Sequence, residues 1–486
     1  MRRLFKALCV GLALIQSAAA ADVPRAVDQA LKKLGIPRAS VAIVVQELGT
    51  AQPELGVNAA VPMNPASVMK LVTTYSALEL LGPAYTWKTE VYADGANLVL
   101  KGYGDPKLNL ESFWMLLRGL RARGLRELQG DIVLDRTYFA PQPDAAFDDD
   151  PFRPYNVAPD ALLVNFKSLR FLFSPDGANG TVRVSAEPAL PGLEIANSLR
   201  LAEGSACPDG RAFRERIQAE FQPRPPRASF AGAYPAACGE REMNVALYPP
   251  QDYVAAMIRQ LWGEMGGTWR GELREGVTPP GARLLYSHES EPLAEVVRDI
   301  NKFSNNVMAR QLYLTLAAET GGAPARPEIA FASIKKLLEA KGIKAPELVM
   351  ENGSGLSRIE RISAAHLAAL LQAAWRSAVM PEFAASLPVV AADGTMKRRL
   401  RGEGVARQAH IKTGLLNDAR TMAGYVLDRS GRRHVVVMLI NHPAAPQADA
   451  AQDALLAWVY EGAGSGKTTG PARARSSPPG VLLRHP

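Results

Sequence analysis

Cysteine is scarce in this sequence, with 3 among 486 residues. Cys9 lies close to the N-terminus, so Cys207 and Cys238 are the pair that remains farther along the chain. No second cysteine pair or histidine cluster lies near them, which argues against a zinc site. The pair either forms a disulfide, as an oxidising compartment would favour, or stays as two separate buried thiols. The sequence predicts neither a metal ion nor an organic cofactor.

The N-terminus lacks an apolar run long enough to cross a bilayer, because its apolar stretch covers only residues 7–17. Basic residues precede this stretch and the small residues 18–20 follow it. This order is typical of a secretory signal peptide, here residues 1–20, and an N-terminal anchor is the alternative. We therefore expect the mature protein to be exported to the periplasm.

The positive charge of the chain lacks the organisation of a nucleic-acid site. Lys and Arg number 56 against 48 Asp and Glu, a net charge of +8. No basic stripe interleaved with aromatic residues is present, so we predict no nucleic-acid partner. The excess charge favours anionic surroundings such as a cell-wall polymer or a membrane surface. Residues 463–486 are basic and poor in apolar residues, and we expect a disordered tail that attaches weakly to the membrane or the sacculus.

Apolar runs near the two ends of the chain predict one α/β layer structure. Strands are expected at residues 40–48, 410–414, 423–427 and 433–440, and helices at 66–81 and 449–460. Two of these strands meet at a short Ser-Gly turn, so an antiparallel sheet flanked by helices is expected.

The middle of the chain differs in character and shows no internal repeat. Residues 86–250 contain many Pro and Gly, short strand-like runs and the cysteine pair, which predicts an inserted module of one or two small β-rich subdomains. Helical spacing returns at 253–265, 293–316 and 329–341. We therefore assign residues 21–85 and 251–462 to one catalytic domain.

A Ser-x-x-Lys tetrad, Ser67 to Lys70, lies at the start of the first predicted helix. Its spacing places a hydroxyl and an amine nearly one helical turn apart on one face. A second tetrad, Ser333 to Lys336, lies in mid-helix without flanking signals and is interpreted as a solvated face. Ser67 follows a proline at a helix start, where backbone N–H groups and the helix dipole are available to a developing oxyanion.

Two further motifs follow in the chain. Ser304-Asn305-Asn306 alone would be read as a polar loop between helices. Lys412-Thr413-Gly414 falls on a predicted strand, where glycine lets a ligand approach the backbone closely. The order Ser-x-x-Lys, Ser-x-Asn, Lys-Thr-Gly resembles that of the penicillin-interacting serine enzymes.

Further stretches within residues 22–462 make the resemblance to one family more specific. They are the runs at 100–108, 301–306, 353–358, 392–395, 411–414 and 423–425. With them the chain resembles the low-molecular-mass D-Ala-D-Ala carboxypeptidase/endopeptidase family with inserted domains. The resemblance implies a penicillin-binding, serine β-lactamase-like transpeptidase fold of the α/β class. It also implies peptidoglycan stem peptides ending in D-Ala-D-Ala as substrates and β-lactam antibiotics as inhibitors.

The resemblance implies catalytic roles for individual residues. Ser67 would attack the carbonyl between two D-alanines, and Lys70 would be the base, which requires its pKa to fall by about three units. Ser304 would relay a proton to the leaving amine. The backbone N–H groups of Ser67 and Leu415 would form the oxyanion hole. Many relatives carry a small polar residue where this chain has Leu415.

The resemblance implies substrate-binding roles as well. Asn306 would orient the acyl chain through its amide. Lys412 and Thr413 would hold the terminal carboxylate of the substrate, next to Gly414. Arg358 is either a substrate contact or a partner in a loop salt bridge.

Three other functions are compatible with parts of this sequence. A non-catalytic peptidoglycan-binding scaffold would keep the fold, but the complete catalytic set is present. A β-lactamase of the commonest class needs a Glu-x-x-Leu-Asn loop, which is absent between residues 306 and 412. A phosphate-binding loop at 461–468 is rejected because its first required glycine is Glu461.

Overall fold

The computed structural model describes residues 22–142, 147–203, 206–208 and 210–463. The predicted signal peptide at 1–20 and the predicted tail beyond residue 463 lie outside the described residues. Across the described part of the chain, no helix combines the length and apolar character needed to span a bilayer.

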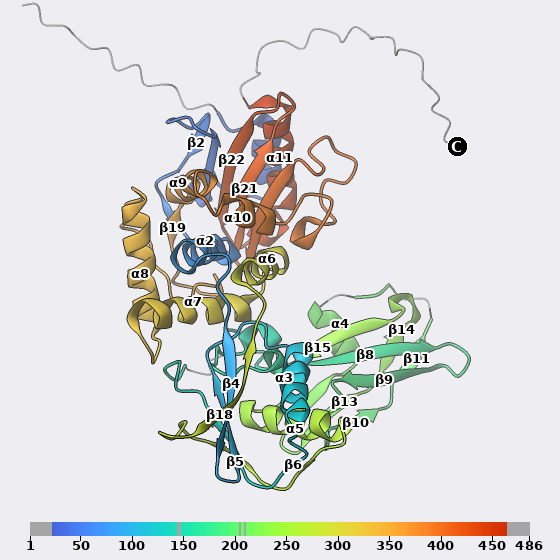
Figure 1. Cartoon of the computed structure of the whole chain (residues 1–486). Coiled ribbons are helices and arrows are strands. Elements are labelled where there is room, and N and C mark those ends of the chain that lie inside the picture. The colour runs from blue at the N-terminus through green and yellow to red at the C-terminus, as the bar shows by residue number, and fades with distance from the viewer. Residues whose placement is uncertain (1–21, 143–146, 204–205, 209, 464–486) are drawn as a thin grey trace, which may run out of the picture.

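An antiparallel sheet joins the two ends of the chain, as expected from the sequence (Figure 1). Its strand order is β2-β1-β22-β21-β20, and every neighbouring pair is antiparallel. The bounds, in that order, are Leu55–Val57, Val41–Glu47, Arg433–Asn441, Ala419–Leu427 and Ala409–Leu416. The N-terminal strand β1 therefore pairs with the last strand, β22.

Helices bury both faces of this sheet, which explains the long apolar runs in its central strands β1 and β22. In β22, Val436 and Met438 face one core, whereas Val435 and Val437 face another, because side chains alternate along a strand. The first core contains α1 (Arg25–Lys33) and α11 (Asp449–Gly462). The second contains α2 (Lys70–Leu81), α6 (Leu293–Phe303), α7 (Asn306–Gly321), α8 (Pro327–Ala340), α9 (Ala364–Trp375) and α10 (Met380–Ser386).

The helical spacing over residues 293–316 contains a break that periodicity does not reveal. Ser304 adopts a left-handed conformation (φ 57°, ψ 36°) and ends α6. The Asn305 side chain then caps α7 by accepting a hydrogen bond from the Met308 N–H. This local cap starts a new helix and leaves Ser304 at the corner between the two.

The inserted part of the chain builds sheets of its own. One has the order β17-β7-β5-β4-β18 and another β14-β11-β9-β8-β15. The first comprises Leu273–Glu275, Ile132–Asp135, Asn97–Gly102, Lys88–Asp94 and Arg283–Glu289. The second comprises Ala233–Pro235, Arg200–Ala202, Thr181–Glu187, Leu169–Asp176 and Arg241–Val245.

Smaller elements complete the insert. A three-stranded sheet joins β10, β13 and β12, and β16 pairs with β6. Their bounds are Glu194–Asn197, Pro226–Phe230, Glu220–Pro223, Thr268–Trp269 and Glu127–Leu128. The helices are α3 (Leu110–Ala122), α4 (Gly210–Arg216) and α5 (Pro250–Glu264).

The chain leaves the insert later than the sequence predicts. The sequence predicts that residue 251 begins the return to the catalytic domain, but α5 packs into the core of the insert. Strand β18 also pairs with β4, so the segment that enters the insert and the segment that leaves it run side by side (Figure 1). The return therefore comes at α6, because pairing between segments almost 200 residues apart leaves no mark on local composition.

The two cysteines of the insert form a disulfide, one of the two states that the sequence left open. Cys207 and Cys238 are bonded across 31 positions of the chain. Closing a loop of this length contributes roughly 3 to 4 kcal/mol in the chain-entropy account.

Candidate active site

Ser67 lies in a 3-10 turn, Ala66–Met69, that leads into α2. This differs from the expected first turn of the α-helix. The preceding residue, Ala66, has a φ of 46°, a conformation that a non-glycine residue adopts only when its surroundings hold it. The Thr421 hydroxyl donates to the Pro65 carbonyl at 2.7 Å and supplies part of that support.

Lys70 lies directly behind Ser67 and is fully buried. Its Nζ is 3.0 Å from Oγ of Ser67, and it donates to Oδ1 of Asn306 and to the carbonyl of Ser354, each at 2.5 Å. A neutral amine has two N–H donors and one lone pair. Since the amide oxygen and the carbonyl can only accept, the lone pair is left for the Ser67 hydroxyl.

The surroundings of Lys70 favour this neutral form. Burial lowers its pKa well below the usual lysine value, and the positive charges of Lys412 and Arg310 lower it further, whereas Glu360 raises it. The lowered pKa that the sequence predicts for Lys70 thus has a physical origin in burial and neighbouring cations.

Ser304 and Lys412 form a second hydroxyl–amine pair. Nζ of Lys412 lies 2.8 Å from Oγ of Ser304 and also donates to the carbonyl of Thr413. Lys412 is fully buried, and burial lowers its pKa to about 7. The positive-φ corner at Ser304 and the strand β20 bring together two residues that lie 108 positions apart.

Strand β20 lies at the edge of the sheet and presents its backbone to Ser67. The Ile411 N–H donates to the Pro388 carbonyl at 2.8 Å, away from β21. Because N–H directions repeat every second residue, the Leu415 N–H points to the same open edge. A Cβ on Gly414 would lie 2.9 Å from the Ser67 nitrogen, so only glycine lets the strand come this close. The Leu415 side chain is 55% exposed.

The loop at 353–358 packs against the turn that carries Ser67. Gly355 has a φ of +80°, and a Cβ there would lie 1.9 Å from the Ala66 carbonyl oxygen and 2.8 Å from Cα of Ser67. The neighbouring Ser354 carbonyl binds Lys70. In the sequence this stretch contributes to the family resemblance and offers Arg358 as a site candidate, but it does not predict these contacts.

We predict that Gly355→Ala slows acylation by a β-lactam on the order of 100-fold, because the added Cβ must displace the backbone that carries Ser67. The rate of loss of free enzyme with a fluorescent penicillin measures this. Gly342→Ala is the matched control, since Gly342 also has a positive φ (+80°) but nothing lies within 4 Å of its Cβ position. Equal rates in the two variants would contradict the prediction.

The run at 392–395 supports the Lys-Thr-Gly strand. Lys302 donates to Oδ2 of Asp393 at 2.7 Å, and Oδ1 of Asp393 accepts from the Val389 N–H. The Thr395 hydroxyl lies 2.8 Å from that of Thr413. Thr413, a predicted carboxylate ligand, is therefore oriented by a threonine that sequence reasoning did not assign to the site.

Arg358 lies apart from the catalytic hydroxyls and amines. It is exposed, and its guanidinium stacks 4.8 Å from the ring centroid of Phe147. Within the described residues it forms no salt bridge, so the loop ion pair considered from the sequence is not observed. It lines a pocket of about 350 Å³ that also includes Leu416 and Asn441.

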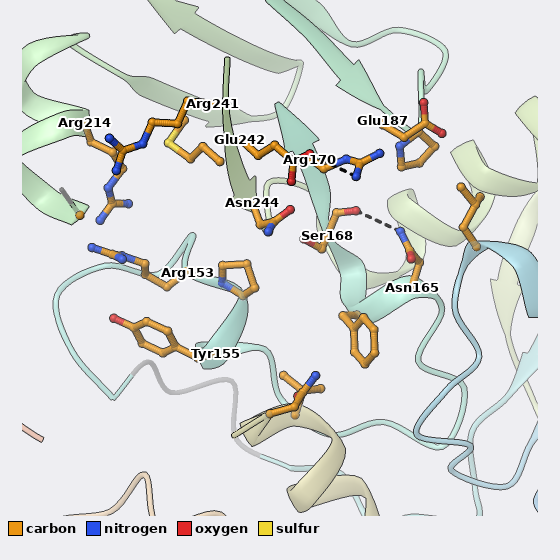
Figure 2. A pocket seen from close by; sticks show the side chains of 18 of the residues that line it. Arg153, Tyr155, Asn165, Ser168, Arg170, Glu187, Arg214, Arg241, Glu242 and Asn244 are labelled. Carbon is orange, nitrogen blue, oxygen red and sulfur yellow. Dashed lines mark hydrogen bonds and ion pairs between the residues drawn. The ribbon is translucent and has the colours of Figure 1, made fainter. Parts of the chain in front are cut away.

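A larger pocket, of about 650 Å³, opens where the insert meets the Ser-Asn-Asn turn (Figure 2). Asn305 and Val307 form its catalytic side. On the insert side, Arg153 and Arg214 both pair with Asp150. The other charged residues that line it are Glu111, Arg170, Glu187, Arg241 and Glu242. Four arginines and three glutamates line the pocket, and Arg170 pairs with Glu242, so charged groups of both signs face it.

Two remaining sequence features lie outside the site. The second tetrad is on the surface of α8, where Ser333 bonds the Thr320 hydroxyl and Lys336 is exposed. Within the described ranges, no group of three or more His, Cys, Asp or Glu side chains is placed to hold a metal ion.

Comparison with known proteins gives matches over nearly the whole chain. A family model described as D-Ala-D-Ala carboxypeptidase 3 (S13) matches residues 23–461. The chain is 28% identical over 463 residues to a D-alanyl-D-alanine carboxypeptidase of an Actinomadura species, with 90% of this chain and 84% of the relative aligned. It is 22% identical to the D-alanyl-D-alanine carboxypeptidase DacB of Haemophilus influenzae, covering 83% and 85%.

Solved structures share the fold. The crystal structure of penicillin binding protein 4 from Haemophilus influenzae superposes with a TM-score of 0.72 at 21% identity, covering 89% of this chain and 99% of that one. A predatory endopeptidase from Bdellovibrio bacteriovorus superposes with a TM-score of 0.51 at 15% identity, covering 89% and 97%. At these identities the likeness establishes the architecture.

Proposed function

The chain belongs to the D-Ala-D-Ala carboxypeptidase 3 (S13) family, and on this premise we propose that Ser67 is the nucleophile with which it cleaves peptidoglycan stem peptides. It is a serine-type hydrolase, acting as D-Ala-D-Ala carboxypeptidase, D,D-endopeptidase or both. The observation that carries the assignment is the 3.0 Å approach of the Ser67 hydroxyl to a fully buried lysine amine. That amine has its lone pair available for the hydroxyl proton.

The first step is acylation. Oγ of Ser67 bonds to the carbonyl carbon between the two D-alanines as its proton passes to Nζ of Lys70. The oxyanion that forms is stabilised by the N–H groups of Ser67 and Leu415. When the C–N bond breaks, Ser304 passes the proton taken up by Lys70 to the departing amine. Lys70 is then neutral again, and the rest of the peptide remains as an ester on Ser67.

Substrate binding and deacylation complete the cycle. Lys412 and Thr413 hold the terminal carboxylate of the substrate, and the Asn306 amide orients the acyl chain. The space left by Gly414 lets the peptide lie against β20. A water molecule then hydrolyses the ester: its oxygen bonds to the acyl carbon, and one of its protons restores the Ser67 hydroxyl. We keep Arg358 as a candidate contact for the more distant part of the substrate.

The function is tested by offering two substrates, a pentapeptide ending in D-Ala-D-Ala and a cross-linked peptide dimer. Release of free D-alanine from the first establishes carboxypeptidase activity, and conversion of the dimer to monomers establishes endopeptidase activity. Failure to cleave either substrate, with no acylation by benzylpenicillin, would refute the proposal.

We predict a bell-shaped dependence of kcat/KM on pH for a substrate with a free carboxylate. Activity rises as the pH passes the lowered pKa of Lys70, because the base must be neutral. It falls as the pH passes about 7, where Lys412 loses the proton that attracts the carboxylate. A peptide amide, which lacks that carboxylate, serves as the control and should not show this fall. A kcat/KM that keeps rising past about pH 8 for the acid substrate would contradict the assignment of Lys412.

We also propose that the protein works in the periplasm, with weak attachment to the membrane or the sacculus. The signal-like residues 1–20 and the basic residues Lys467, Arg473, Arg475 and Arg484 support this. Deleting residues 465–486 should release more protein from the envelope fraction at low salt, with peptidase activity unchanged. Equal retention of the full and shortened chains would end the attachment proposal.

A further inference from the structure

Glu360 is a fully buried carboxylate in the loop beside Lys70. Its Oε1 accepts hydrogen bonds from three successive backbone N–H groups, those of Glu351, Asn352 and Gly353, at 3.1, 3.1 and 3.2 Å. Successive N–H groups form a cradle for an anion. A buried carboxylate without hydrogen bonds would be costly, so these three hydrogen bonds hold the turn in place around the Glu360 carboxylate.

The turn held by Glu360 leads directly to the catalytic pair. Its next residue, Ser354, supplies the carbonyl that binds Nζ of Lys70. Gly355 follows and lies against the backbone of Ser67. A displacement of the turn therefore moves the Ser354 carbonyl, which accepts from Lys70, and the Gly355 backbone, which packs against Ser67.

The charges around Glu360 connect it with the base as well. Its carboxylate interacts with Lys70 of α2 and with Arg310 and Tyr313 of α7. Lys412 of β20 acts on Lys70, and Glu351 acts on Arg310. The Glu360 carboxylate thus raises the pKa of Lys70, whereas burial and the charges of Lys412 and Arg310 lower it. Burial raises the pKa of Glu360 itself, and its three N–H donors oppose that rise.

We propose that Glu360 is a positioning residue for acylation, holding the Glu351–Gly353 turn so that the Ser354 carbonyl keeps Nζ of Lys70 aligned with Oγ of Ser67. It acts through Lys70 and does not contact the substrate. The inference rests on the proposed roles of Ser67 and Lys70 as nucleophile and base.

Two substitutions distinguish the effect of the length of the Glu360 side chain from the effect of its charge. Glu360→Asp keeps the charge but withdraws the carboxylate from its cradle, and we expect acylation by benzylpenicillin to slow on the order of 10- to 100-fold. Glu360→Gln keeps the length and removes the charge. Without that charge the protonated form of Lys70 is less stable, so its pKa falls and the acid limb of the acylation rate moves to lower pH.

Glu347→Gln is the matched control. Glu347 also binds a backbone N–H, that of Ser363 at 3.0 Å, and it pairs with His366. In the part of the chain that the structure describes, its hydrogen bonds and its ion pair go to Ser363 and His366 and not to Ser67, Lys70, Ser304 or Lys412. This variant should lose stability without moving the acid limb. Circular dichroism and thermal unfolding establish whether each variant is folded. If Glu360→Asp does not fold, Glu360→Gln still tests the proposal.

The proposal stands if Glu360→Gln shifts the acid limb downward and Glu360→Asp slows acylation at least tenfold more than the control does. It is overturned if the acid limb of Glu360→Gln stays where the wild type has it, or if Glu347→Gln produces the same changes. Failure of the wild-type protein to be acylated would instead refute the proposed function of Ser67.

Discussion

Ser67→Ala is expected to leave no covalent adduct after incubation with benzylpenicillin, whereas the wild-type protein gains the mass of one penicillin. The alanine has no oxygen to form the ester, and the neighbouring Lys70 amine is enclosed by its contacts with Asn306 and Ser354. Removing a nucleophile that works with a paired base typically costs on the order of 10⁴- to 10⁶-fold in rate. Intact-mass spectrometry and D-alanine release from a pentapeptide both measure the loss.

The second tetrad provides a control within the same chain. Ser333→Ala removes a serine with the same Ser-x-x-Lys spacing, but on the exposed face of α8, and it should be acylated like the wild type. Loss of the adduct in Ser67→Ala alone would identify the nucleophile. No adduct and no drug consumption in the wild type would favour the non-catalytic scaffold. Rapid consumption of the drug without an adduct would favour a β-lactamase.

Lys70→Met should reduce the acylation rate about 10²- to 10⁴-fold while the protein stays folded. Methionine fills a similar volume but has no nitrogen lone pair to take the Ser67 proton. The nucleophile remains, so a slow adduct is expected on long incubation, in contrast to Ser67→Ala. The measurement is the second-order rate constant of acylation by benzylpenicillin at several pH values.

The pH dependence makes this variant informative. Wild-type acylation should rise through the lowered pKa of Lys70, and Lys70→Met should lose that rise because no base titrates there. Lys336→Met, on the exposed second tetrad, is the control and should keep both rate and profile. Acylation of Lys70→Met at the wild-type rate would contradict the assignment of Lys70 as the base.

The sequence alone determined the motifs and the elements on which they lie. Ser67 at the start of a helix and Lys412 on a strand are predicted from the sequence, because hydrophobic period and short-range spacing are local properties. The sheet that joins the two chain ends was predicted for the same reason. Its central strands β1 and β22 carry long apolar runs because helices bury both faces of the sheet. The break between α6 and α7 at Ser304 does not show in the hydrophobic period.

Only the tertiary structure decided how these parts meet. Nζ of Lys70 reaches Asn306 across 236 positions of the chain, and the Ser354 carbonyl reaches Lys70 across 284. Glu360 shows no signal in the sequence, since a glutamate in a polar loop is ordinarily solvated and only packing turned this one inward. The later return from the insert was equally hidden, because the pairing of β18 with β4 depends on contacts between distant segments. Local pattern encodes each element, whereas burial and long-range pairing set the distances and charges on which catalysis depends.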